Sequence, residues 1–169
     1  MTHSTGDAIV ALRPIERDVA AALLAGQQPA GIVFAPGYPS PFSLEVMDLL
    51  AGVRAAEAGL DFHSWFVVRS DDDAVVGEIG YGFDEGSATA TLGYTIVEPC
   101  WGRGYATGGL RALVEHLRAE GRVRRLEAKA PVDHVASRRV MEKVGMQLCG
   151  RRLEEIDGEL VDLAVYEIA

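Results

Sequence analysis

The sequence predicts a single α/β domain with a mixed, mostly antiparallel β-sheet flanked by helices, in the order βααβββαβαββ. Three observations lead to this prediction. Strand-length apolar runs alternate with helical spacings, one strand–helix–strand crossover is recognisable, and an Asp-Gly pair near the C-terminus marks a tight hairpin. The chain has 169 residues, 49% of them hydrophobic, which is enough for one sizeable core. We therefore expect residues 1–169 to form one domain.

The N-terminal part is expected to contain one strand and two helices. Ala8–Leu12 is a short apolar strand, and Glu16–Ala25 has helical spacing. The stretch AGIVFAPGYPSPF is expected to be a loop, because four glycine and proline residues fall within Pro36–Pro41. Helical spacing resumes over Ser43–Ala58, with Ser43 as the expected N-cap.

Antiparallel strands follow. Trp65–Arg69 and Val75–Phe83 are β-rich runs, and the acidic run Asp71–Asp73 between them is expected to form an exposed hairpin tip. A strand at Ala90–Val97 leads into the crossover. It continues through a glycine-rich loop, a helix and a strand at Arg125–Ala130.

The C-terminal part is predicted to hold one more helix and one more hairpin. The helix Asp133–Val144 ends at Gly145, a typical C-terminal signal. The two-residue turn lies within IDGE, Ile156–Glu159.

The net charge and the number of cysteines exclude several classes of partner and of site. A formal net charge of -9 disfavours nucleic-acid partners, which usually meet a basic face. Cys100 and Cys149 are too few for a disulfide framework or a thiolate zinc site, so we expect two reduced thiols and no metal. No activating base adjoins Cys100 in the sequence, which excludes it as a nucleophile. No leader or membrane-length window is recognisable, so we expect a cytoplasmic protein without a membrane partner.

The most informative stretch is WGRGYATGGLRALVEHL, Trp101–Leu117. Its apolar positions form one helical face, which places the helix start at Gly104 or Tyr105. Gly102 and Gly104 permit a tight turn, and the free N–H groups and dipole of a helix start attract anions, phosphate above all. A flexible helix start without a ligand is the alternative.

Two familiar phosphate motifs do not fit this stretch. A P-loop requires a Gly-Lys-Ser/Thr ending that is missing here. A dinucleotide fingerprint requires a third glycine where Thr107 stands, although Glu127 is spaced like a ribose ligand. Gly108 and Gly109 lie inside the helix at a propensity cost of about 1 kcal/mol each, which indicates that another element packs closely against them.

The run LGYTIVEPCWGRGYAT, followed by DHVASRRVMEKVGM, resembles the GNAT superfamily of acyl-CoA N-acyltransferases. It is especially similar to the subgroup of ribosomal-protein N-terminal alanine acetyltransferases, over about Trp65–Ala169. The resemblance implies a GNAT-like fold and acetyl-CoA (coenzyme A) as cofactor. It further implies direct transfer, in a ternary complex, to the primary amine of a protein N-terminus or a small molecule, and a homodimer.

The resemblance also implies which residues bind the cofactor. The loop that wraps the pyrophosphate corresponds to Trp101, Gly102, Arg103, Gly104, Tyr105 and Ala106, with a further backbone donor at Thr107. Trp101 departs from the family's Gln or Arg. Val97 would contact the pantetheine arm through its backbone. His134 replaces the family's asparagine, and either contacts the arm or is a solvated residue of the helix start.

The resemblance further bears on the catalytic residues. Ser137 is in the family a candidate to protonate the leaving thiolate, or else it bonds back to its own helical turn. The family's tyrosine in this helix falls at Met141, and its strand glutamate falls at Thr91. We nominate Glu78 as the base, against the alternative of a solvent-facing strand residue. Deprotonation at pH 7 costs an α-amine about 1 kcal/mol and a lysine about 4.6 kcal/mol, so a weak base favours α-amines.

Further positions carry weaker expectations. Tyr38 and Phe42 fall where the family shapes its acceptor pocket, with plain packing as the alternative. His63 is expected to be a strand-edge residue rather than a base. Because several family positions are replaced, a non-catalytic acyl-CoA sensor or scaffold is the competing function.

Overall fold

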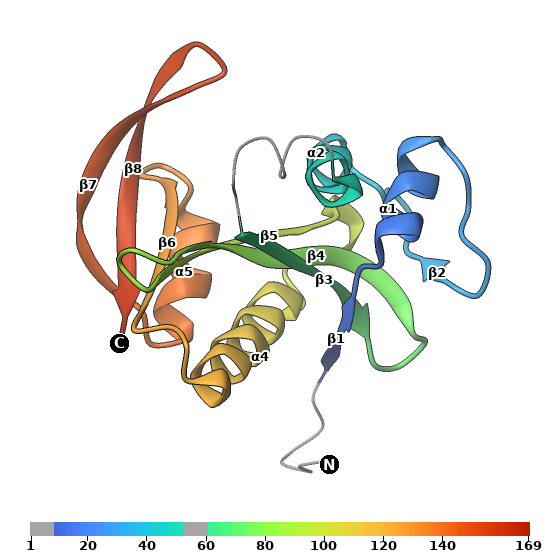
Figure 1. Ribbon diagram of the computed structural model, residues 1–169, viewed down its shortest axis with the longest axis horizontal. Coiled ribbons are helices and arrows are strands. Elements are labelled where there is room, and N and C mark those ends of the chain that lie inside the picture. The colour runs from blue at the N-terminus through green and yellow to red at the C-terminus, as the bar shows by residue number, and fades with distance from the viewer. Residues whose placement is uncertain (1–8, 53–60) are drawn as a thin grey trace.

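The protein, described here by a computed structural model, is characterised over residues 9–52 and 61–169. An eight-stranded sheet with the order β1-β3-β4-β5-β6-β8-β7 forms its centre, and β2 pairs with β4 off this path. Figure 1 shows α1 and α2 on one face of the sheet and α4 on the other. The mixed, mostly antiparallel sheet flanked by helices confirms the predicted fold class.

The elements have the following bounds. The strands are β1 (Val10–Pro14), β2 (Val33–Phe34), β3 (Asp61–Arg69), β4 (Ala74–Asp84), β5 (Thr89–Ile96), β6 (Arg125–Pro131), β7 (Gln147–Ile156) and β8 (Glu159–Ile168). The helices are α1 (Arg17–Leu24), α2 (Pro41–Ala51), α4 (Tyr105–Glu120) and α5 (Val135–Lys143), with a 3-10 turn η1 (Glu98–Cys100).

Two predictions near the N-terminus are corrected. The segment expected to be a loop contains the short strand β2, which runs parallel to the start of β4. Helix α2 begins at Pro41 because Ser40, not Ser43, is the N-cap, and the two serines form a reciprocal capping box. The helix ends at Ala51, followed by Gly52 in a left-handed conformation. The rest of the predicted helix, together with Ala8, lies outside the described residues.

Helix α4 packs on the sheet through its apolar face. Leu110, Leu113 and Leu117 are fully buried. A Cβ at Gly108 would lie 3.0 Å from Val10, and one at Gly109 would lie 3.3 Å from Val67. The two helical glycines therefore allow α4 to approach β1 and β3 closely, as their cost in propensity predicted.

The crossover strands separate at their ends. Strands β5 and β6 pair in parallel from Thr89 to Leu92 and from Arg125 to Ala128. Beyond Leu92 the register stops, although β5 continues to Ile96 and β6 to Pro131. The two strands thus diverge beside the start of α4, and the site is assembled around this divergence.

Candidate active site

The glycine loop ends where α4 begins, at the predicted position. Gly102 and Gly104 have φ angles of 72° and 82°, a left-handed conformation that favours glycine. Gly104 is the N-cap, and the Gly108 N–H donates to the Gly104 carbonyl at 2.9 Å. The N–H groups ahead of this bond belong to Tyr105, Ala106 and Thr107. Together with the helix dipole, they make this end of α4 fit for an anionic group such as a pyrophosphate.

The loop side chains differ in what they offer an anion. Arg103 is exposed, so its charge is accessible. Tyr105 is buried in the core, so only its backbone is available to a ligand. Trp101 is 63% exposed, and its indole N–H donates to the Ile96 carbonyl. The indole therefore ties the loop to the end of β5.

The end of β5 corrects the prediction for Val97. Its N–H donates to the Val76 carbonyl at 2.9 Å, and its carbonyl accepts from the Cys100 N–H at 2.9 Å. Backbone groups alternate sides along an antiparallel strand, so those of Tyr94 and Ile96 face away from β4, toward the diverging β6. An extended ligand between β5 and β6 would meet Tyr94 and Ile96 rather than Val97.

His134 serves the start of α5. Its Nδ1 accepts a hydrogen bond from the Ser137 N–H at 3.2 Å, which makes it the N-cap. The ring is exposed. Of the two roles considered for His134, the structure supports the helix-start role directly.

The Ser137 side chain bonds across the fold rather than back to its own turn. The Tyr94 hydroxyl lies 2.8 Å from Ser137 Oγ and 2.9 Å from the Ser137 carbonyl oxygen. Burial raises the pKa of the Tyr94 phenol, an effect that the hydrogen bond to Ser137 partly offsets. The phenol is therefore protonated at neutral pH and can donate.

Glu78 is buried, so the solvent-facing alternative is wrong. The residue is 2% exposed, and neither carboxylate oxygen has a hydrogen-bond partner of standard geometry among the described residues. Burial raises the pKa of Glu78 to about 7. A carboxyl group with this pKa is suited to general base catalysis at neutral pH.

Two hydroxyl groups lie near Glu78 and partly offset the effect of burial. Ser43 and Tyr38 both lower the Glu78 pKa, Ser43 more strongly. Tyr38 is 7% exposed and its ring stacks on Phe34 at a centroid distance of 5.2 Å. Its own pKa is raised, first by burial and then by the charge of Glu78. Tyr38 thus packs in the core behind Glu78. This agrees with the alternative of plain packing that the sequence offered for this residue.

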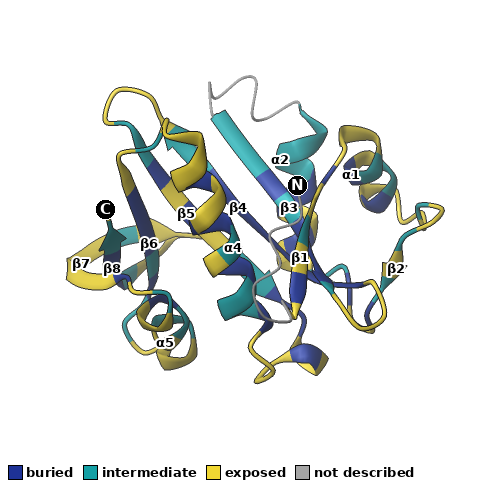
Figure 2. Ribbon diagram, turned by 90° about the horizontal axis from the view of Figure 1, so that it is seen from below, coloured by how far each residue is buried: buried dark blue, intermediate teal, exposed yellow. Residues whose placement is uncertain are grey.

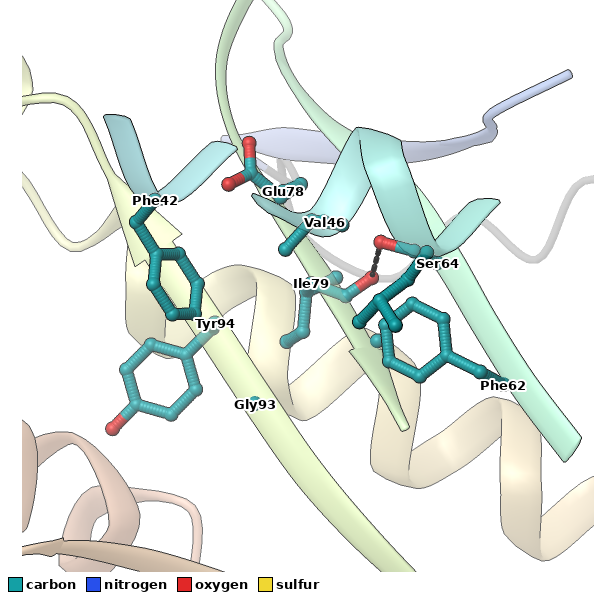
Figure 3. A pocket seen from close by; sticks show the side chains of 10 residues that line it. Phe42, Val46, Phe62, Ser64, Glu78, Ile79, Gly93 and Tyr94 are labelled. Atoms are coloured by element: carbon teal, nitrogen blue, oxygen red, sulfur yellow. Dashed lines mark hydrogen bonds between the residues drawn. The ribbon is translucent and has the colours of Figure 1, made fainter. Parts of the chain in front are cut away.

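A small, mostly apolar pocket connects Glu78 with Tyr94. Its volume is about 130 Å³, and it is lined by Phe42, Val46, Leu49, Phe62, Ser64, Glu78, Ile79, Gly80, Gly93 and Tyr94. Phe42, predicted to shape an acceptor pocket, is half exposed on its rim. Figure 3 shows the rings of Phe42 and Tyr94 near each other at one end, with the Ser64 hydroxyl bonded to the Ile79 carbonyl toward the other.

The structure also shows the surroundings of His63, of the acidic run Asp71–Asp73 and of the two cysteines. His63 Nε2 lies 2.6 Å from Asp61 Oδ1, and its ring stacks on Tyr81. At the exposed hairpin tip, Arg69 pairs with the acidic run. The thiols of Cys100 and Cys149 are both free, and Cys100 is buried.

Comparison with known proteins assigns the family. A model of the acetyltransferase (GNAT) domain matches residues 10–147, well over half of the chain. The chain belongs to the GNAT acetyltransferase domain family. This GNAT domain is similar to p20 of Bacillus licheniformis, described as an uncharacterized N-acetyltransferase. The two are 24% identical over 105 residues, which cover 60% of this chain and 59% of that protein.

Solved structures also resemble the GNAT domain. A GNAT-family acetyltransferase from Bacillus anthracis aligns with a TM-score of 0.57 and 25% identity, over 62% of this chain and 64% of that one. RimL, a ribosomal-protein alpha-N-acetyltransferase in complex with coenzyme A, aligns with a TM-score of 0.70 and 21% identity, over 95% and 93%. The likeness to RimL shows the shared fold. The chain spans less than two thirds of the length of the first two relatives.

Sequence reasoning did not nominate two residues of the candidate site. Tyr94 supplies a phenol from β5, whereas the family's helical tyrosine is replaced by the buried Met141. Ser43 was interpreted only as a cap, yet its side chain lies near Glu78. The alternation of β5 could have placed Tyr94 on a defined face, but no local signal pairs it with Ser137. Among the helices described, none is long and apolar enough to cross a membrane.

Proposed function

We propose that this GNAT domain is an acetyl-CoA-dependent N-acetyltransferase that acetylates a primary amine by direct transfer in a ternary complex. The buried Glu78 carries the proposal, because it lines the same pocket as Tyr94, and the Tyr94 hydroxyl is hydrogen-bonded to Ser137. A buried carboxyl group whose oxygens have no hydrogen-bond partner of standard geometry among the described residues is costly for stability, which favours a role in function. The residues at the start of α4 fit the pyrophosphate of the cofactor.

When bound, acetyl-CoA supplies the acetyl thioester. The N–H groups at the start of α4 and the Arg103 side chain hold its pyrophosphate. The backbone groups of Tyr94 and the Ile96 N–H, which face away from β4, orient the extended arm, while the Ile96 carbonyl accepts the Trp101 indole N–H. Glu78 accepts the proton that the acceptor amine loses, directly or through a water molecule. Tyr94, hydrogen-bonded to Ser137, holds a proton at its hydroxyl oxygen and delivers it to the leaving thiolate.

An α-amine is the acceptor that these residues favour. At pH 7 a Glu78 with a pKa of about 7 is roughly half ionised, so it is a moderate base. The cost of about 1 kcal/mol for an α-amine, against about 4.6 kcal/mol for a lysine, decides the preference. The small apolar pocket favours an amine that carries a small uncharged side chain. The description of RimL as an alpha-N-acetyltransferase supports a peptide N-terminus.

We also propose a homodimer and a cytoplasmic location. The free thiol of Cys149 is exposed, which suits a reducing compartment. No other strand of the described residues pairs with the outer side of β7, which leaves a sheet edge for a second copy.

The test is release of coenzyme A thiol from acetyl-CoA in the presence of three acceptors. They are a peptide with a free alanine N-terminus, the same peptide with a blocked N-terminus and one lysine, and a polyamine. We expect the free N-terminus to react fastest, and Glu78→Gln to abolish most of the rate while still binding acetyl-CoA. Glu127→Gln is the matched control, because Glu127 is also buried but is paired with Lys129 and Arg152 outside the pocket. Saturable binding of acetyl-CoA without turnover of any acceptor would instead support the sensor.

A further inference from the structure

Strand β7 ends the sheet with an exposed edge. It is the last strand in the order, and no other strand of the described residues pairs with its outer side. Figure 2 shows β7 exposed, whereas β6 is largely buried. Leu153 on β7 is 67% exposed, and Leu160 on β8 is 74% exposed. Exposed leucines on an open edge are a liability unless a partner covers them.

The charges along β7 reverse their sign about Leu153. Two arginines, Arg151 and Arg152, precede Leu153, and two glutamates, Glu154 and Glu155, follow it. We propose that β7 pairs antiparallel with β7 of a second copy of this chain, about a two-fold axis at Leu153. In this register Arg152 lies opposite Glu154 of the second copy, and Arg151 lies opposite Glu155 of the second copy. The two sheets then form one continuous sheet.

The backbone favours the same register. The turn residues Asp157 and Gly158 have φ angles of 51° and 82°, typical of a two-residue hairpin in which Ile156 and Glu159 form a hydrogen-bonded pair. Bonding alternates along the strand, so the N–H and carbonyl groups of Arg151, Leu153 and Glu155 face outward. A two-fold axis at Leu153 brings these outward groups together. A register shifted by one residue would centre on groups already bonded to β8.

The regular part of the strand is also centred on Leu153. A register shift between Leu148 and Gly150 interrupts β7 at one end, and the turn after Ile156 closes the other. Residues 150–156 therefore form the uninterrupted edge, with Leu153 at its midpoint. Both the charge pattern and the regular backbone thus share one centre.

The side chains gain partners in this arrangement. Opposed residues share a face, so the two copies of Leu153 contact each other, and Leu160 lies diagonal to Leu153 on the same face. Glu155 has no ion pair within the described chain and gains Arg151 of the second copy. Arg152 lies 3.6 Å from Glu154 and from Glu127 of its own chain, so it joins an existing charge network.

Charged residues normally protect an edge from pairing, and two copies with a net charge of -9 repel each other. Here the edge charges oppose most pairings but complement this one. A parallel pairing in register would place arginine beside arginine and glutamate beside glutamate. The edge is therefore specific for a second, antiparallel copy.

This inference rests on the proposed homodimer and not on acetyl transfer. Sedimentation equilibrium of the full chain tests it, with Glu155→Arg as the main variant and Glu115→Arg as the control. Glu115 is an exposed helical residue away from the edge, and its substitution changes the charge equally. We expect Glu155→Arg to weaken dimerisation about tenfold, because two attractive pairs become repulsive, and Glu115→Arg to leave it unchanged.

The decisive experiment exchanges the charges of one pair, Arg151 and Glu155, between the two copies. Arg151→Glu alone also weakens the dimer, and mixing it with Glu155→Arg restores a mixed dimer, because each altered residue then faces its opposite charge. Circular dichroism melting checks Arg151→Glu for folding, since Arg151 also pairs with Asp162. A wild-type dimer that none of these variants weakens would overturn the β7 interface while leaving the homodimer intact. A monomeric wild type would overturn both, and acetyl transfer would remain to be judged by its own assay.

Discussion

The hydroxyl group of Tyr94 on β5 lies 2.8 Å from the hydroxyl group of Ser137 on α5, across a gap of 43 residues in the sequence. The bond joins the two elements that border the divergence of β5 and β6. It also links Ser137 to Tyr94, which lines the same pocket as Glu78.

If Tyr94 and Ser137 act as one unit, their substitutions are not additive. We expect Tyr94→Phe and Ser137→Ala each to lower kcat about 10- to 100-fold, and the double variant to be little slower than either. The measurement is a double-mutant cycle on kcat, with acetyl-CoA affinity followed by calorimetry. Independent effects that multiply would separate the two residues.

Acetyl transfer should depend on the ionisation of Glu78. A base must be unprotonated, so kcat should rise with pH and level off above an apparent pKa of about 7. Glu78→Gln should remove this rise along with most of the rate. The profile is best measured with an acceptor amine whose own pKa is known, and a wild-type profile that follows only the amine would count against Glu78.

The same residue should make stability depend on pH. The pKa of Glu78 is raised from 4.5 to about 7 by folding, so the folded state favours the protonated form. The stability that the folded protein has with Glu78 protonated is fully present below the unfolded pKa of 4.5, and it is lost as pH rises through about 7. Glu78→Gln, which mimics the protonated form, should match the wild type at low pH and exceed it at pH 8 by up to about 3 kcal/mol.

Urea unfolding at the two pH values measures this difference. Glu127→Gln is again the control, and it should not show a stability gain that grows with pH. Equal stability of Glu78→Gln and the wild type at pH 8 would mean that Glu78 is ionised without cost in the folded protein.

The start of α4 should bind acetyl-CoA partly through Arg103. Arg103→Glu replaces an accessible positive charge with a negative one, and we expect acetyl-CoA affinity to fall about 5- to 30-fold, or about 1–2 kcal/mol. Titration calorimetry measures the affinity. Arg124→Glu, at an exposed position before β6, makes the same charge change away from the loop and should bind normally. An equal loss in both variants would indicate a general charge effect.

The sequence by itself determined the order of the main elements and the helix start at Gly104. Both depend on local signals, namely apolar periodicity, turn residues and glycine spacing, which act over a few residues. The incorrect prediction of Ser43 instead of Ser40 as the N-cap of α2 also arose from local signals, because two serines three residues apart can each cap the same helix. The strand β2 was missed because its two residues gain their structure only by pairing with β4.

The tertiary structure decided the state of the site. Glu78 could have faced solvent or core, and its burial in the folded protein, beside Ser43 and Tyr38, raises its pKa. The Tyr94–Ser137 contact and the loss of Val97 as a backbone donor likewise follow from sheet register and strand divergence. Local patterns encode secondary structure, but burial and hydrogen-bond partners arise from residues far apart in the chain, and these set the chemistry of a buried carboxyl group.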